Sequence, residues 1–110
     1  MAESVDALKA DLFRSMAHPA RIRILELLVV RDRSVTELLP AVGLEASNLS
    51  QQLTVLRRAG IITARRHGNA VTYSVASVHI AELLAVARTV LSGLLDEQAG
   101  ALGISAVDAS

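Results

Sequence analysis

The sequence predicts a mainly α-helical fold with a small β component, an α+β fold in the order α-α-α-α-β-β-α. Apolar residues recur at spacings of three and four over most of the chain, which is the period of an amphipathic helix. Only between 61 and 75 do short β-favouring runs replace that period, on either side of the turn residues His67, Gly68 and Asn69. The length of 110 residues suits one domain, and an apolar content of 52% excludes intrinsic disorder.

Two helices are expected at the start of the chain. Apolar residues between Val5 and Met16 predict the first helix, and a second is expected over about 19–30. Pro19 separates them, because the residue before a proline avoids the helical region while proline itself suits the first turn of a helix.

The next two predicted helices are joined by a tight turn. Ser34 and Glu37 form a capping box, in which each side chain satisfies a free backbone N–H at a helix start. The helix that follows is expected to be short or distorted at Pro40, which has no N–H to donate. After a turn at Gly43, a fourth helix is expected over about 46–58. Two helices joined by a short glycine-containing turn are typical of a helix-turn-helix.

A hairpin and a long helix complete the predicted fold. The strands are expected over about 61–66 and 70–75, and a hairpin directly after a helix-turn-helix makes it a winged one. The last helix is expected from 78 to about 98. Residues 1–98 would then form one winged helix-turn-helix domain, and 99–110 a flexible tail of small residues with little pattern.

The fourth predicted helix has the composition of a DNA-recognition helix. Leu49, Leu53 and Leu56 form a stripe for burial, and the other side is polar. Asn and Gln can pair bidentately with adenine, and Ser bonds bases or phosphates. The alternative is an ordinary solvated face, but such faces usually carry Glu and Lys, and neither occurs in this helix after Glu45. The residues predicted to contact DNA from this helix are Ser47, Asn48, Ser50, Gln51, Gln52, Thr54, Arg57 and Arg58.

Positive charge is concentrated in this helix and the hairpin. The whole chain has 11 basic and 11 acidic residues, a balance that by itself argues against a nucleic-acid partner. Residues 46–81, however, contain four arginines and no acidic residue. Arginine suits phosphate because its fork donates bidentately, although a solvated turn or compensation of the helix dipole is the alternative. The hairpin residues predicted to contact DNA are Arg65, Arg66, His67 and Asn69.

The last predicted helix indicates a homodimer. Between Ile80 and Leu95 it is apolar over more than half its circumference, and a chain of this size has too few elements to cover it. The first helix also has an apolar stripe. We expect a two-fold interface that places two recognition helices about one DNA turn apart, ~34 Å, on a pseudo-palindromic operator. The residues predicted at this interface are Leu8, Leu12, Ile80, Leu84, Ala87, Leu91 and Leu94.

Three segments of the sequence resemble the ArsR/SmtB family of bacterial winged-helix metalloregulators. They are LFRSMAHPARIRILELL (12–28), SVTELLPAVGLEASNLSQQLTVLRRAGII (34–62) and ARRHGNAVTYSV (64–75), and the similarity spans about residues 8–95. The resemblance implies a dimeric, sequence-specific transcriptional regulator, most often a repressor. Such a regulator binds double-stranded operator DNA and leaves it, or binds it differently, when an effector arrives. It would act in the bacterial cytoplasm, associated with the nucleoid.

The effector sites implied by the resemblance are largely missing from this sequence. One site would use cysteines at the positions of Ser34 and Thr36, but the chain has no cysteine, and hydroxyls are poor ligands for soft metals. The other retains His79 as its remaining candidate ligand, although a single histidine is more often an ordinary surface or interface residue. The other positions of that site are Ser77, Val90 and Gly93. We therefore expect no required cofactor, and a transition-metal effector such as Ni or Zn stays open.

Two other classes of function are weighed against this one. Because metal ligands are missing, the chain could be a winged-helix interaction subunit that works with a separate metal- or ligand-sensing protein. An enzyme is less favoured, since no cysteine nucleophile, glycine-rich phosphate loop or Ser/His/Asp spacing is present. We expect no membrane partner, because no apolar run approaches the roughly 18 residues of a membrane span and the N-terminus has no signal sequence.

Overall fold

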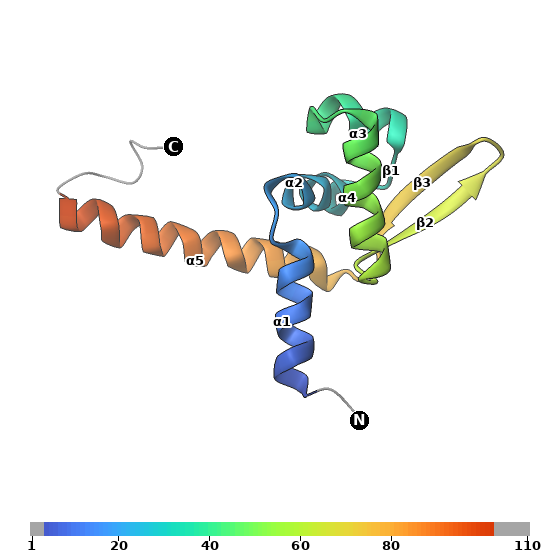
Figure 1. Ribbon diagram of the computed structural model, residues 1–110. Coiled ribbons are helices and arrows are strands. Elements are labelled where there is room, and N and C mark those ends of the chain that lie inside the picture. The colour runs from blue at the N-terminus through green and yellow to red at the C-terminus, as the bar shows by residue number, and fades with distance from the viewer. Residues whose placement is uncertain (1–3, 103–110) are drawn as a thin grey trace. The chain divides into compact units, whose positions relative to one another are not determined.

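The computed structural model of the chain describes residues 4–102, which divide into two compact units, one up to Ile80 and one from Ala81. The first unit contains, in order, α1, α2, β1, α3, α4, β2 and β3 (Figure 1). Helix α5 (His79–Leu102) begins at the end of the first unit and forms the described part of the second. The order confirms the predicted helix-turn-helix with its hairpin and adds one strand, β1.

Helices α1 and α2 have the predicted bounds, Val5–Met16 and Pro19–Val30. A side chain caps the start of each helix, Ser4 in α1 and His18 in α2. The His18 Nδ1 accepts a hydrogen bond from the Ala20 N–H at 3.0 Å. Ser, Thr, Asp and Asn usually fill this role. The cap therefore occupies one of the two ring nitrogens of His18 and leaves the other at the surface.

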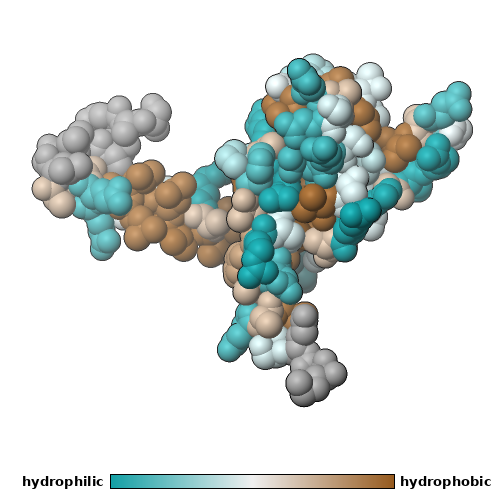
Figure 2. All heavy atoms as spheres, in the orientation of Figure 1, coloured by the Kyte–Doolittle hydropathy of each residue, from teal (hydrophilic) through white to brown (hydrophobic). Residues whose placement is uncertain are grey.

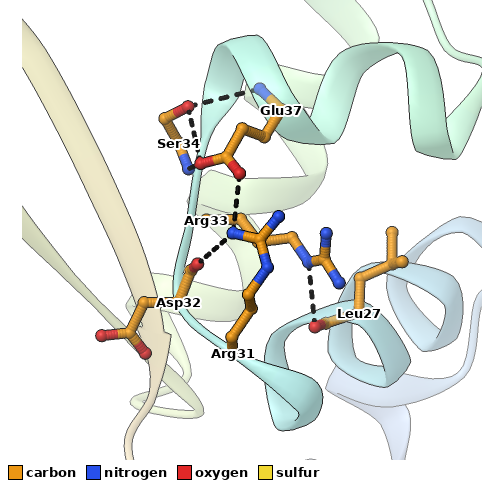
Figure 3. Close-up of polar contacts among 6 residues, drawn as sticks. All are labelled: Leu27, Arg31, Asp32, Arg33, Ser34 and Glu37. Atoms are coloured by element: carbon orange, nitrogen blue, oxygen red, sulfur yellow. Dashed lines mark hydrogen bonds and ion pairs between the residues drawn. The ribbon is translucent and has the colours of Figure 1, made fainter.

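Helix α3 (Val35–Val42) starts at the predicted capping box (Figure 3). Ser34 Oγ accepts from the Glu37 N–H at 3.3 Å, and Glu37 Oε1 accepts from the Ser34 N–H at 3.2 Å. The other carboxylate oxygen of Glu37 accepts from Arg31 Nη1 at 2.7 Å. The Arg31 guanidinium, and after it the Ser34 N–H, hold the pKa of Glu37 below its ordinary value of 4.5. The helix is short, as predicted, with 8 residues that include Pro40.

The sheet has three antiparallel strands in the order β1-β3-β2, one more than the sequence predicts. β2 (Ile62–His67) and β3 (Ala70–Val75) form the predicted hairpin, and β1 (Arg33–Ser34) pairs along the other edge of β3. Arg33 Nε also donates to the Leu27 carbonyl at 3.1 Å, which ties β1 to α2 (Figure 3). Two residues whose partner strand lies far along the chain have no local β pattern, so sequence periodicity does not predict β1.

The core of the first unit is aliphatic. Helix α4 (Ala46–Arg58) buries the predicted stripe of Leu49, Leu53 and Leu56. Helix α2 packs against α3, α4 and β3, and α4 packs against β2. The side chains that are almost fully inaccessible to solvent are Ile24, Leu25, Leu28, Leu38, Leu49, Leu56 and Ile62. One side of α4 is therefore held in the core, and its opposite side faces outward.

Two helices keep apolar side chains at the surface. Leu8 of α1 is 53% exposed, and Met16 is the residue of that helix that the fold buries. In α5, Leu91 is 55% and Leu94 is 52% exposed, and Figure 2 shows hydrophobic side chains along this helix. No helix within residues 4–102 is long and apolar enough to cross a membrane. Exposed apolar area of this kind marks an interaction surface more often than an ordinary protein exterior.

The predicted end of the last helix is wrong by four residues, since α5 runs to Leu102 and not to about 98. Ala99 and Ala101 favour helix strongly, and a single intervening glycine costs only about 1 kcal/mol. The rest of the predicted tail, 103–110, lies outside the described residues. The predicted extent of the domain, 1–98, stays a prediction beside the two compact units that meet after Ile80.

Candidate nucleic-acid interface

The turn between α3 and α4 depends on Gly43. Its φ of 75° lies in the left-handed region that a β-carbon disfavours, and its N–H donates to the Leu39 carbonyl at 3.1 Å. Glu45 follows as the extended N-cap residue of α4, without a side-chain cap bond. This short turn and the buried leucine stripe together determine which side of α4 faces outward.

The predicted DNA-contacting residues of α4 differ in solvent exposure and in whether their side chains already form hydrogen bonds. Asn48, Gln52 and Thr54 are half-buried. Gln52 Nε2 donates to Asn48 Oδ1 at 3.0 Å, and Thr54 Oγ1 donates to the Ser50 carbonyl at 2.8 Å. Arg57 and Arg58, at the end of the helix, are exposed. We call the exposed residues Ser47, Ser50 and Gln51 the polar face of α4.

Gln51 is the side chain of this polar face best suited to contact a base. It is exposed, and its amide forms no hydrogen bond with any group of residues 4–102. A free Gln amide both donates and accepts, which matches the N6 and N7 positions of adenine. Ser47 lies one turn earlier on the same side of the helix. The first half of α4 therefore exposes short, uncharged polar side chains, which suit contacts with base edges in the major groove of DNA.

The hairpin β2–β3, which we call the wing, presents its predicted residues on two sides. Arg65, Arg66, His67 and Asn69 are all exposed, and Arg65 Nε donates to His67 Nε2 at 3.0 Å. Successive residues of a strand point to opposite faces, so Arg65 and His67 share one face of the ribbon and Arg66 lies on the other. The sequence prediction grouped all four residues, but the strand geometry prevents Arg65 and Arg66 from facing DNA in the same way.

Within the described residues, no carboxylate pairs with the arginines of α4 and the wing. Ion pairs such as Arg14 with Asp11 and Arg31 with Glu37 lie elsewhere in the first unit. The four arginines of residues 46–81 have no ion pair with a carboxylate within 4–102. Uncompensated positive charge beside a neutral polar helix face is the electrostatic pattern of a phosphate-binding surface.

Two residues of the implied metal sites, Ser34 and Ser77, form hydrogen bonds at helix starts. Ser34 caps α3, and Ser77 Oγ accepts from the His79 N–H at 3.1 Å at the start of α5. His79 is exposed. Between Ser4 and Leu102, no three His, Asp or Glu side chains come close enough together to hold a metal ion.

The predicted interface residues fall into two groups. Leu8, Leu12, Leu91 and Leu94 are exposed by 36–55%, and Ala87 is exposed as well. Ile80 and Leu84, in contrast, are only 8% and 7% exposed in the single chain. The second group therefore has little surface left to bury against another copy.

The fold and this basic, acid-free surface define a winged helix-turn-helix protein of the DNA-binding class. The sequence profile described as "Bacterial regulatory protein, arsR family" matches residues 18–64. The uncharacterized HTH-type transcriptional regulator Rv0081 of Mycobacterium tuberculosis is 64% identical over 101 residues, which cover 91% of this chain and 89% of that protein. The chain therefore belongs to the arsR family of bacterial regulatory proteins, a class of transcriptional regulators and not of enzymes.

Solved structures and a further relative agree with this family. The crystal structure of Rv0081 matches with a TM-score of 0.81 and 65% identity, over 88% of this chain and 98% of that chain. The homodimeric winged helix-turn-helix DNA-binding domain Mb0332 of Mycobacterium bovis matches with a TM-score of 0.74 and 28% identity, over 88% and 95%. The biofilm growth-associated repressor of Xylella fastidiosa is 35% identical over 81 residues, 74% of this chain and 71% of that protein.

Proposed function

We propose that this chain is a homodimeric transcriptional repressor that binds a pseudo-palindromic operator in the bacterial cytoplasm. The polar face of α4 would enter the major groove, and the wing would lie along the phosphate backbone. The observation that carries the proposal is the exposed, unbonded Gln51 amide on a helix that, together with the wing, contains four arginines and no acidic residue between 46 and 81. The repressor of Xylella fastidiosa and the homodimer of Mycobacterium bovis support the finer parts of the proposal.

The two parts of this surface would contribute differently to binding. Gln51 would discriminate between bases, because its amide pairs in a plane with one base edge. Arg65 would contribute affinity on every sequence, because phosphates are the same at each position. The Arg65–His67 hydrogen bond orients the guanidinium before DNA arrives, so fewer side-chain conformations are lost on binding.

Dimerisation would double this contact. The exposed leucines of α1 and α5 are the apolar surface that a second copy would cover. Two copies related by a two-fold axis place their α4 helices in successive major grooves, about 34 Å apart. The operator would accordingly have two half-sites of opposite orientation.

The test is a selection of bound duplexes from a random library, followed by anisotropy titrations of the selected operator and a scrambled duplex. Gln51→Ala should reduce the preference for the operator by about 1–3 kcal/mol while scrambled DNA binds as before. Arg65→Ala should weaken both duplexes alike and lower the salt dependence by about one unit of slope. If wild-type protein does not prefer any selected duplex over scrambled DNA, the proposal is wrong.

The releasing signal would reach the protein by a route other than the two implied metal sites. Ser34 and Ser77 serve as helix caps, and hydroxyls are poor ligands for soft metals. We therefore expect operator affinity to be the same with and without Ni²⁺ or Zn²⁺ in these titrations. A change of tenfold or more would show that the chain itself holds a metal effector.

A further inference from the structure

A groove of about 470 Å³ lies between the start of α2 and the outer side of α4. His18 and Arg21 line it from the α2 side, and Ser50, Thr54 and Arg58 are among the residues that line it from α4. We call it the basic groove, since two guanidinium groups and an imidazole line it and no carboxylate does. Gln51 also lines it, so the groove adjoins the polar face of α4.

Arg21 is the unusual residue of this groove. Its Nε is buried and has no hydrogen-bond partner within residues 4–102. Buried polar donors in proteins almost always have an acceptor. Arg21 therefore lines the groove with a guanidinium that no acceptor within residues 4–102 satisfies at Nε.

His18 adds a second donor whose direction is settled by the helix cap. Its Nδ1 accepts from the Ala20 N–H, so the ring proton must be on Nε2 even when the imidazole is neutral. Nε2 is consequently a donor in both protonation states. Because His18 is exposed and lines the groove, this donor is accessible to a ligand there.

Arg58 supplies a further charge from the opposite wall. It is exposed, and no carboxylate within residues 4–102 pairs with it. The Thr54 hydroxyl already donates to the Ser50 carbonyl, so Arg58 is the charged donor that α4 contributes to the groove, beside the Ser50 hydroxyl and the Gln51 amide. N–H donors on two walls and net positive charge fit a tetrahedral oxyanion that accepts several bonds at once.

We propose that the basic groove binds one backbone phosphate of the DNA whose bases α4 contacts. Arg21 and Arg58 neutralise the phosphate, and the His18 Nε2–H donates to one of its oxygens. The inference rests on the proposed function, because the phosphate belongs to the same duplex. It makes the start of α2 a third DNA-contacting element, and it fixes the depth at which α4 sits in the major groove.

The experiment replaces single phosphates of the selected operator with neutral methylphosphonates, one position at a time, and measures affinity by anisotropy. Wild-type protein should lose about tenfold at one position in each half-site, the value of one charged hydrogen bond. Arg21→Ala should bind the unmodified operator about tenfold more weakly, with a salt slope lower by about one. The methylphosphonate at that one position should not lower the affinity of Arg21→Ala further, because this variant no longer makes the contact.

Two further variants keep the test decisive if Arg21→Ala folds poorly. His18→Ser preserves an efficient helix cap but removes the imidazole donor, so it should show a smaller loss at the same phosphate. Arg23→Ala is the matched control, since Arg23 is an exposed arginine of α2 that does not line the groove. It should leave the methylphosphonate pattern unchanged.

The outcomes separate this inference from the proposed function. If wild-type protein prefers its operator but Arg21→Ala keeps the wild-type methylphosphonate pattern, the basic groove does not bind a DNA phosphate. Equal losses by Arg21→Ala at every position would assign Arg21 a structural role and overturn the inference. Inorganic phosphate that raises the melting temperature of wild-type but not Arg21→Ala protein, without the methylphosphonate effect, would assign the groove to a free anion instead. Absence of any operator preference would overturn the proposed function itself.

Discussion

The fold leaves two kinds of surface open, and their chemistry is opposite. The polar face of α4 and the wing expose amides, hydroxyls and arginines without any acid, whereas α1 and α5 expose leucines. Water solvates the first surface well, so only a charged, hydrogen-bonding partner such as DNA gains by displacing it. Water solvates leucine poorly, so any apolar partner gains, including an identical copy. One short chain can therefore suit two kinds of partner, because its exposed polar side chains and its exposed apolar side chains lie on different helices.

The largest effect is expected from a charge placed in the apolar surface. Leu91→Glu should convert the proposed dimer into monomers in sedimentation, because a carboxylate would be buried without a partner at the interface. Operator affinity should fall about 100-fold or more, since the two half-sites would no longer be bound together. Thr89→Glu is the control, because that exposed residue lies on the opposite side of α5 at 100° per residue. A Leu91→Glu variant that stays dimeric would contradict the assignment of this surface.

An intermediate effect is expected from the start of α3, which packs against α2 in the unit that carries α4 and the wing. Ser34→Ala removes the side-chain acceptor for the Glu37 N–H and should cost about 1 kcal/mol of unfolding free energy. For a chain of this size that corresponds to a melting temperature lower by about 4–8 °C. The dimer should persist in sedimentation, because the exposed leucines proposed to form it belong to α1 and α5 and not to α3. Loss of the dimer in this variant would show that the two surfaces are not independent.

The smallest effect is a dependence of stability on pH that arises from Glu37. Its pKa is lowered in the folded state, first by the Arg31 guanidinium and then by the Ser34 N–H. The ionised carboxylate therefore stabilises the fold above the ordinary value of 4.5, and this contribution disappears as the pH falls through the lower folded value. Chemical denaturation should find Glu37→Gln less stable than wild type at neutral pH, with the difference shrinking as the pH falls below 4.5. A difference that is constant with pH would mean that the ion pair does not contribute.

Local signals were sufficient to predict most of the helices. The bounds of α1, α2 and α4 follow from Pro19, from the leucine stripe and from the pattern of apolar spacing, each of which acts within a turn or two of helix. The capping box at Ser34 and Glu37 was also predictable, since both partners lie within four consecutive residues. The end of α5 was misjudged because glycine weakens a helix without forbidding it.

The candidate site was predictable on α4 and the wing but not beside them. Polar composition and the absence of acid identified Ser47, Ser50 and Gln51, but the bond between Gln52 and Asn48 that holds two other candidates required coordinates. Nothing in the sequence indicated that His18 and Arg21 contribute to one binding site. They lie some thirty residues from the part of α4 that completes the basic groove, and ordinary helix starts also contain such residues.

By itself the sequence determined the family, the element order of the helix-turn-helix and wing, and the separation of basic from apolar segments. Each of these is encoded in spacing and composition, which act over a few residues. The tertiary structure decided the pairing of β1 with β3, the opposite faces of Arg65 and Arg66, and the position of Arg21 and Arg58 in the lining of one groove. These features depend on how buried side chains pack segments that are distant in the chain, and no local pattern contains that information.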